Sequence, residues 1–371
     1  MVDTTQSCQR IAGYDLARSI AIFGMIVHHF VIVSAAVQQS SFWLSMLTFL
    51  LDGRPAAMFL ILAGVGITLR SRRAVESNDA ILIEYEAGIL WKRGWLLLLL
   101  GLLNLLVWPG DILRVYGVSL LLASKLINAS NRRLLCVSAF MVTGFVVLLF
   151  LLNYEKNWDW TTMTYHQLWT TEGMLRNLFY DGFRAVFPWS GFLFFGMWLG
   201  RHDLRNRAAI LMCVTIGFAV TLVAEAVSAI SVENLLSDPN IEPDRRGEIM
   251  AVFGTKSMPP LPLFLMAAGG LAIAIIGISI YVTEAFPHSI VVRSLSLTGQ
   301  MALTWYFVHI YFGLGMLVMF HAVGNQSMGF AIASGSGFFL FAMFASSFWR
   351  NRYQYGPLEW GFRKLSSNSA P

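Results

Sequence analysis

Three ionisable side chains lie within the first long apolar segment of the chain. Arg18 lies near its start, and His29 follows eleven residues later, directly after His28. A helix rises about 1.5 Å per residue, so Arg18 and His29 would lie roughly 16 Å apart along one axis. If Arg18 marks a membrane surface, His29 lies near mid-bilayer, where an ionisable group costs about 2.5 kcal/mol or more unless it is paired or faces a polar cavity. The placement of Arg18 and His29 therefore indicates a functional role for these side chains.

A neutral imidazole near the membrane centre is a suitable general base, because its ordinary pKa of about 6.5 matches proton transfer at neutral pH. Neighbouring residues of a helix diverge by about 100°, so His28 and His29 do not both face one cavity. His309, in the segment Thr304–His309, lies at nearly the same depth as His29 in a later apolar run. We expect His29 and His309 to line one polar tunnel. The simpler alternative makes Arg18 a membrane anchor and the histidines packing residues.

A second constellation is Asp52-Gly53-Arg54-Pro55, which precedes another apolar run. Pro55 suits a helix start, and Asp52 complements the helix dipole there. Arg54 lies on the side of the membrane that is poor in basic residues, so we expect it to hold an anionic or polyhydroxy ligand, with Asp52 beside it. Gly64 and Gly66 predict close helix packing.

Basic residues on the opposite side form candidate phosphate contacts. They are Arg72, Arg73, Lys92 and Arg93. Topology alone also explains them, because loops that face the cytoplasm are enriched in Lys and Arg.

The composition is that of a membrane protein. Of the 371 residues, 56% are hydrophobic and only 13% are charged, whereas soluble domains carry about 25% charged residues. In a membrane protein, the distribution of the basic residues among the loops indicates orientation. The net charge of +5 is therefore no argument for nucleic-acid binding. Cys8, Cys136 and Cys213 are scattered, and no cluster has the spacing of metal ligands, so we expect neither disulfides nor a metal.

Apolar runs long enough to cross a bilayer recur along the chain. Val33-Ser34-Ala35 resembles a signal-peptide cleavage site, but two histidines inside the preceding apolar core are unusual for one, so we expect a retained first span. We predict an all-α polytopic protein with about ten transmembrane helices, over residues 17–37, 55–70, 92–108, 112–128, 134–152, 184–200, 208–228, 260–283, 298–322 and 329–349.

Most basic residues fall on one side of these spans, which places both termini in the cytoplasm. The other side holds Arg54, Arg114, Lys156, Arg176, Arg184, Arg245, Arg246 and Lys256. Two external loops, 153–183 and 229–259, are long enough to be functional or disordered. Tryptophans in the first loop are typical of an interfacial aromatic belt or, alternatively, of sugar stacking. We expect a single domain over residues 1–371.

Several motifs resemble a known superfamily. Asp15-x-x-Arg18 with ten residues before His29 resembles the signature of membrane acyltransferase family 3. Tyr306-x-x-His309 resembles a motif shared with heparan-alpha-glucosaminide N-acetyltransferases. The YeiB-like bacterial membrane family is the nearest in pattern, through the segments Gly53–Phe59, Leu303-Thr304-x-Tyr306 and Tyr355-Gly356-Pro357-Leu358-Glu359-Trp360.

The resemblance implies a helical domain of the bacterial cytoplasmic membrane that takes an acyl group from cytoplasmic acyl-CoA. Arg18, with Asp15, would lie along the CoA route, His29 would lie near the acyl group, and His309 would face the same tunnel. The heparan-type and YeiB-like proteins tend to have Asn where this chain has His29. This difference leaves two readings open, base catalysis or hydrogen bonding to the oxyanion.

The sequence therefore predicts an acyltransferase, with acetyl-CoA or another acyl-CoA as donor and a sugar or amino acceptor outside the cytoplasm. His29 is the expected base, with His28 or His309 as its partner, and Arg54, Asp52 and Tyr306 near the acceptor. A transporter of a small polar metabolite and a non-catalytic relative are the alternatives. The bilayer surrounds the protein, and the sequence leaves open whether it is a homodimer.

Overall fold

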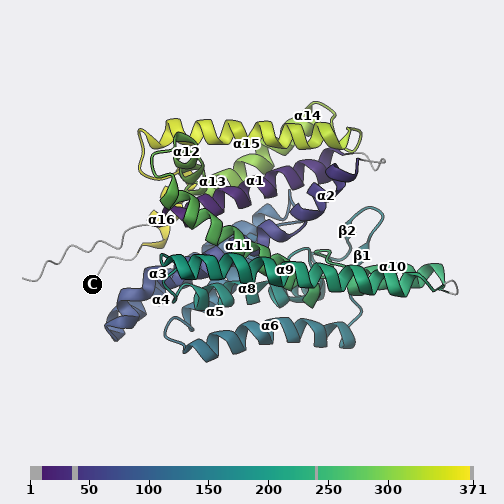
Figure 1. The fold of residues 1–371 in the computed structure, drawn as a ribbon, viewed down its shortest axis with the longest axis horizontal. Coiled ribbons are helices and arrows are strands. Elements are labelled where there is room, and N and C mark those ends of the chain that lie inside the picture. The colour runs from purple at the N-terminus through teal and green to yellow at the C-terminus, as the bar shows by residue number, and fades with distance from the viewer. Residues whose placement is uncertain (1–10, 36–40, 239–240, 368–371) are drawn as a thin grey trace, which may run out of the picture. The chain divides into compact units, whose positions relative to one another are not determined.

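The computed structural model describes residues 11–35, 41–238 and 241–367 (Figure 1). Cys8, Arg10 and the end of the first expected span lie outside them. In the N-terminal half, the helices are α1 (Ala12–Ser34), α2 (Phe42–Leu51), α3 (Arg54–Glu76), α4 (Ala80–Asn104), α5 (Leu113–Ser124), α6 (Asn131–Leu151), α7 (Thr171–Arg176), the π-helix η1 (Asn177–Asp181) and α8 (Val186–Leu199). The strands β1 (Trp158–Asp159) and β2 (Thr164–Tyr165) pair antiparallel in the first long loop.

The C-terminal half is also helical. It contains α9 (Arg207–Leu236), α10 (Pro243–Phe253), α11 (Pro262–Ala285), α12 (Ile290–Gly299), α13 (Ala302–Val308), the π-helix η2 (His309–Leu314), α14 (Gly315–Met319), α15 (Met328–Arg350) and α16 (Pro357–Ser366).

Among the described residues, seven helical stretches are long and apolar enough to cross a membrane: Ala12–Ser34, Phe42–Glu76, Asn131–Leu151, Arg207–Leu236, Pro262–Ala285, Ala302–Met319 and Met328–Arg350. Leu113–Ser124, Val186–Leu199 and Ile290–Gly299 are shorter apolar helices. The expectation of an all-α protein with several membrane spans is confirmed. The count of ten spans and the cytoplasmic position of the termini stay predictions.

The expected span 298–322 differs from a single helix. Met301 leaves helical geometry between α12 and α13, and the backbone widens into η2 from His309 onward. Hydropathy reports how apolar a segment is, but a backbone break of this kind depends on neighbouring helices, so the pattern did not reveal it.

The chain divides into two compact units. The first contains residues 1–51, 204–218 and 273–359, and the second contains residues 52–203, 219–272 and 360–371. Both units draw on distant parts of the sequence. The expected single domain stays a prediction.

In the first unit, α1 packs against α12, α13, η2 and α15, and it runs alongside α15 in Figure 1. Glycines permit the close approach of these helices. A Cβ at Gly335 of α15 would lie 2.9 Å from the Val27 backbone of α1, and a Cβ at Gly299 would overlap the Asp15 carbonyl oxygen. The helix that carries Arg18 and His29 is therefore enclosed on several sides.

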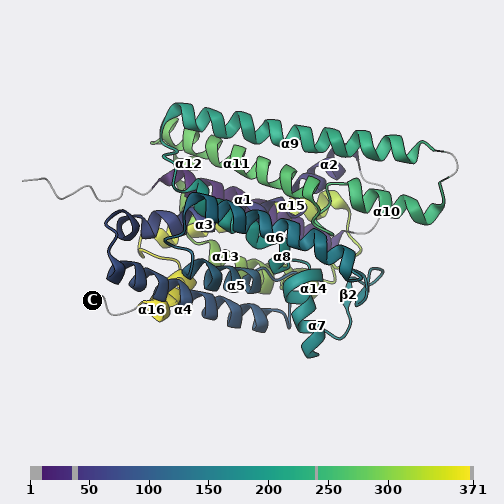
Figure 2. The ribbon, with the colours of Figure 1, turned by 90° about the horizontal axis from the view of Figure 1, so that it is seen from below.

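In the second unit, α8 packs against α3, α5 and α6, and α4 lies beside α5 (Figure 2). Backbone meets backbone where α3 crosses α8. A Cβ at Gly64 would overlap the Leu193 carbonyl oxygen, and a Cβ at Gly196 would overlap that of Ile61. The close packing expected at Gly64 is confirmed.

The change Gly64→Ala should separate α3 from α8 and destabilise the protein by about 1–3 kcal/mol, as overpacking does. The control is Gly337→Ala in α15, where nothing lies within 4 Å of an added Cβ, so the better helix propensity of Ala should be neutral or stabilising. Thermal denaturation in detergent, followed by size-exclusion fluorescence, measures both. Equal midpoints for the two variants would contradict the backbone contact.

Candidate active site

Two histidines from distant segments meet inside the first unit. His29 lies near the end of α1 and is half-buried, whereas His309 follows α13 at the first residue of η2 and is fully buried. His29 Nδ1 lies 2.9 Å from His309 Nε2, within hydrogen-bond distance, and the ring centroids are 5.1 Å apart. The structure thus brings together the two histidines that the sequence placed at equal depth.

The surroundings of His309 fix the direction of this hydrogen bond. His309 Nδ1 lies 2.9 Å from the Trp305 carbonyl oxygen, and a carbonyl only accepts, so Nδ1 carries the hydrogen. In a neutral ring, Nε2 then bears the lone pair and accepts from His29 Nδ1–H. This assignment leaves the lone pair of His29 on Nε2, which is the nitrogen that would act as a base.

The other residues near the pair take distinct positions. The His28 ring centroid lies 6.3 Å from that of His29, as expected for neighbours on a helix, while the hydrogen bond to His309 goes to His29. Tyr306, one turn before His309, meets its ring edge-on at 5.8 Å. The structure therefore places Tyr306 against the buried partner of the pair.

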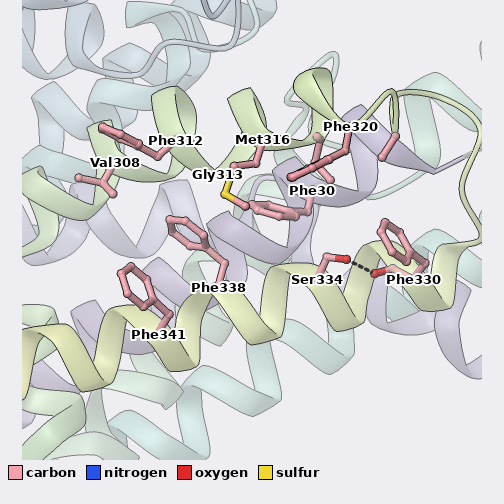
Figure 3. A pocket seen from close by; sticks show the side chains of 12 residues that line it. Phe30, Val308, Phe312, Gly313, Met316, Phe320, Phe330, Ser334, Phe338 and Phe341 are labelled. Atoms are coloured by element: carbon pink, nitrogen blue, oxygen red, sulfur yellow. Dashed lines mark hydrogen bonds between the residues drawn. The ribbon is translucent and has the colours of Figure 1, made fainter.

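The sequence neighbours of the two histidines line an apolar cavity of about 820 Å³ (Figure 3). Phe30 and Val308, the neighbours of His29 and His309, both line it. The Ser334 hydroxyl in its wall donates to the Phe330 carbonyl oxygen at 2.7 Å, so the wall offers hydrocarbon contacts. The other lining residues are Phe312, Gly313, Met316, Leu317, Phe320, Ala322, Phe330, Phe338 and Phe341.

Charged and amide side chains form a hydrogen-bonded series at the start of α1. The Asp15 carboxylate is buried and accepts hydrogen bonds from Arg18 Nη1 at 2.6 Å and from Gln300 Nε2 at 3.2 Å. Gln300 Oε1 in turn accepts from Arg350 Nη2 at 2.7 Å. The Arg18 side chain keeps 28% of its surface exposed, so it is oriented by Asp15 and still accessible.

Sequence reasoning missed Gln300 and the pairing of Arg350. In the sequence, Arg350 is one of many basic residues near the ends of apolar runs. Gln300 carried a weak signal, since it is a hydrogen-bonding amide between two apolar helices. Neither signal identifies the partner, because the contact of Gln300 with Asp15 joins residues 285 positions apart and that of Arg350 with Gln300 joins residues 50 positions apart.

Two of the motifs that carried the family resemblance also touch. Glu359 accepts hydrogen bonds from the Thr304 backbone N–H at 3.0 Å and from its hydroxyl at 2.6 Å. The Leu358 N–H donates to the same hydroxyl at 3.2 Å. The C-terminal motif therefore contacts the first turn of α13, the helix that directly precedes His309.

Arg54 and Asp52, expected to contact a ligand, have protein partners in the second unit. Arg54 Nη2 lies 2.5 Å from Glu225 Oε1, and the arginine side chain is only 3% exposed. Glu225 Oε2 accepts from Thr255 Oγ1 at 2.7 Å, and Asp52 accepts from both the N–H and the hydroxyl of Ser257. Glu225, a charge deep in an apolar run, thus has its partners. A ligand role for Arg54 and Asp52 stays a prediction.

The remaining basic candidates lie in the second unit. Arg72 pairs with Glu76 at 2.7 Å, both side chains being exposed, and Arg93 Nε donates to Ser366 Oγ at 3.1 Å. Arg73 and Lys92 are exposed. An exposed ion pair such as Arg72–Glu76 contributes about 0–1 kcal/mol, and a phosphate-binding role for these four residues stays a prediction.

The long loop between α6 and α8 is folded around an acidic side chain. Asp181 accepts from the Tyr165 hydroxyl at 2.7 Å and from Arg176 Nε at 3.0 Å. Burial raises the pKa of the Asp181 carboxyl, and the two hydrogen bonds partly offset this effect. Trp158 is buried and donates to the Asp181 carbonyl oxygen at 2.7 Å, whereas Trp169 is exposed. The buried tryptophan serves packing.

Within residues 11–35, 41–238 and 241–367, no group of three or more His, Cys, Asp or Glu side chains has the arrangement of a metal site. The expectation that the protein uses no metal stays a prediction.

The Arg54–Glu225 pair gives a stability test. Glu225→Ala should destabilise the protein by about 3–5 kcal/mol, because it leaves the buried guanidinium without this carboxylate. Glu76→Ala, which breaks the exposed pair with Arg72, should change stability by less than about 0.5 kcal/mol. Thermal denaturation in detergent compares them. Equal midpoints would show that the Arg54–Glu225 pair is dispensable for folding and would favour a ligand role for Arg54.

Comparison with known proteins agrees with the motifs. Residues 10–224 match the family model described as heparan-alpha-glucosaminide N-acetyltransferase, catalytic. Residues 248–368 match a family of proteins of unknown function (DUF418), which includes the YeiB-like proteins. No curated protein sequence matches the chain. The first match contains Arg18 and His29, and the second contains His309 and Glu359.

The matches confirm the resemblance drawn from the motifs, and they indicate an acyltransferase of the membrane in general terms. The first match spans more than half of the chain. The chain therefore belongs to the heparan-alpha-glucosaminide N-acetyltransferase catalytic family.

Proposed function

We propose that the protein transfers an acyl group, acetyl in the simplest case, from cytoplasmic acyl-CoA to a sugar or amino acceptor across the bacterial cytoplasmic membrane. The observation that carries the proposal is the 2.9 Å contact between His29 and His309 inside membrane-spanning helices. Two imidazoles held together there supply an oriented proton acceptor. The family membership supports the reaction class.

The tautomers assigned to His29 and His309 are consistent with the following order of proton transfer and bond breaking. His29 Nε2 accepts the proton of the acceptor hydroxyl or amine as its oxygen or nitrogen attacks the thioester carbonyl. The carbon–sulfur bond then breaks, and the proton passes to the departing CoA thiolate. His309 supports the charge that develops on His29 by accepting its Nδ1–H, as the orienting group does in other base-assisted transfers.

A thioester is already activated, so the protein mainly has to hold donor and acceptor in place, remove a proton and stabilise the oxyanion. Direct transfer and an acyl-histidine intermediate both fit this geometry. A burst of free CoA from acyl-CoA in the absence of acceptor would favour the intermediate.

Arg18 is proposed to contact the donor phosphates. Its guanidinium is held by Asp15 yet partly exposed, so it offers a fixed positive charge about 16 Å along the helix axis from His29. Arg72, Arg73, Lys92 and Arg93 are proposed as further donor contacts on the strength of their charge. Homodimer formation is compatible with this proposal and is not required by it.

The donor is tested first. Acetyl-CoA at about 100 times its dissociation constant should add ~2.7 kcal/mol of stability, seen as a rise of several degrees in the thermal midpoint of the purified protein. Arg18→Ala should lose this rise, each variant being compared with its own ligand-free midpoint. Arg293→Ala, which removes an exposed arginine from α12 of the same unit, should keep it. No rise with acetyl-CoA or longer acyl-CoAs, at millimolar concentration, would favour the transporter alternative.

The change His29→Asn separates the two readings of this position. The Asn amide replaces the Nδ1–H donor to His309 but has no counterpart of the Nε2 lone pair. If His29 is the base, kcat should fall by about 10²–10⁴-fold while the thermal midpoint stays near that of the wild type. A variant with nearly full kcat would instead assign hydrogen bonding to this residue, as the Asn of its relatives suggests.

A further inference from the structure

The start of α13 lacks a capping side chain of its own. Met301 occupies the N-cap position and makes no side-chain hydrogen bond to the helix. The first backbone N–H groups of a helix have no partner within the helix, and Ser, Thr, Asp or Asn usually supplies one from the N-cap. At this position in an apolar segment, uncapped N–H groups would weaken the first turn.

Glu359 supplies the missing cap from α16. One carboxylate oxygen accepts the Thr304 N–H and the other accepts the Thr304 hydroxyl, at 3.0 and 2.6 Å. Thr304 is the third residue of α13, the position whose N–H a capping side chain normally takes. A carboxylate there also interacts favourably with the positive end of the helix dipole.

The surrounding chain is shaped to admit this carboxylate. A Cβ at Gly356 would overlap Glu359 Oε2, so only glycine leaves the space. The Trp349 indole donates to the Tyr355 carbonyl oxygen at 2.9 Å, which ties this turn to the end of α15. The segment before α16 is therefore held where Glu359 reaches α13.

The same helix carries His309, five residues after Thr304. Trp305 lies between them, and its carbonyl oxygen accepts from His309 while its indole donates to Ser346 Oγ of α15 at 2.7 Å. A displacement of the first turn would therefore reach the histidine through one continuous hydrogen-bonded helix. Misplacement of a catalytic group by about 1 Å can cost roughly 10²-fold in rate.

We propose that Glu359 is a positioning residue that caps α13 and thereby holds His309 against His29. The inference rests on the proposed acyl transfer for its kinetic consequence. Its structural part, the capping of α13 by a carboxylate from a different helix, holds for any reaction at the histidine pair.

The kinetic test compares Glu359→Ala, Glu359→Gln and a control. Glu359→Ala should lower kcat about 10²-fold and leave the KM for acetyl-CoA within about twofold, because the donor contacts near Arg18 remain. Glu359→Gln should recover most of the activity, since its amide oxygen still accepts the Thr304 N–H. Glu284→Ala removes an exposed carboxylate from α11 in the same unit and should behave as the wild type.

A second measurement does not depend on activity. Backbone amides of residues 302–309 should exchange with deuterium faster in Glu359→Ala than in the wild type or Glu284→Ala. Unchanged exchange and unchanged kcat in Glu359→Ala would overturn the positioning role. Faster exchange in a protein that transfers no acyl group would uphold the cap and reject the proposed reaction.

Loss of folding in Glu359→Ala would be addressed with Thr304→Val, which replaces the hydroxyl with a methyl group and leaves the Thr304 N–H bonded to the carboxylate. The kcat of Thr304→Val should fall by less than the roughly 10²-fold expected for Glu359→Ala, and the KM for acetyl-CoA should stay constant. A rise in KM with constant kcat would contradict the proposal, since it would place Glu359 and Thr304 at the donor.

Discussion

An imidazole inside a hydrocarbon layer must have a polar partner, and the rest of the first unit is arranged around that requirement. His29 and His309 satisfy it for each other. Because they belong to α1 and to the α13–η2 segment, their hydrogen bond ties two helices that are far apart in sequence. The glycines that let α1 approach α12 and α15 serve this contact, since a wider spacing between the helices would disturb it. The π-helix that begins at His309 fits the frequent occurrence of such bulges at functional sites.

Two carboxylates fix the connection between α12 and α13. Asp15 holds Gln300, and Glu359 holds Thr304. Asp15 also orients Arg18, so one buried carboxylate links the proposed donor contact to the helix of the buried histidine. A buried charge persists only when its hydrogen-bonding capacity is met, and both arginine and glutamine contribute to meeting that of Asp15.

Much of this could be predicted from the sequence, because apolar length and the position of a charged residue along a helix are local properties. Several apolar helices long enough to cross a membrane occur where the sequence predicts spans, and His29 and His309 lie together as their matched depth implied. The partners of Asp15, Thr304 and Glu225 could not be found in this way. They depend on the rotation of each helix about its axis and on contacts between distant segments, which hydropathy does not encode. Arg54 shows the difference. Its unusual position was evident, but its pairing with Glu225 required the fold.

The hydrogen bonds from Asp15 and Glu359 to the α12–α13 connection also constrain how the protein is made. Asp15 lies 285 residues before Gln300, and Glu359 lies 55 residues after Thr304. During synthesis, α1 enters the membrane long before α13 exists, so Asp15 and His29 must first be accommodated without Gln300 and His309. The connection is complete only after Glu359 has left the ribosome. Membrane insertion of α1 and assembly of the histidine pair are therefore separate events.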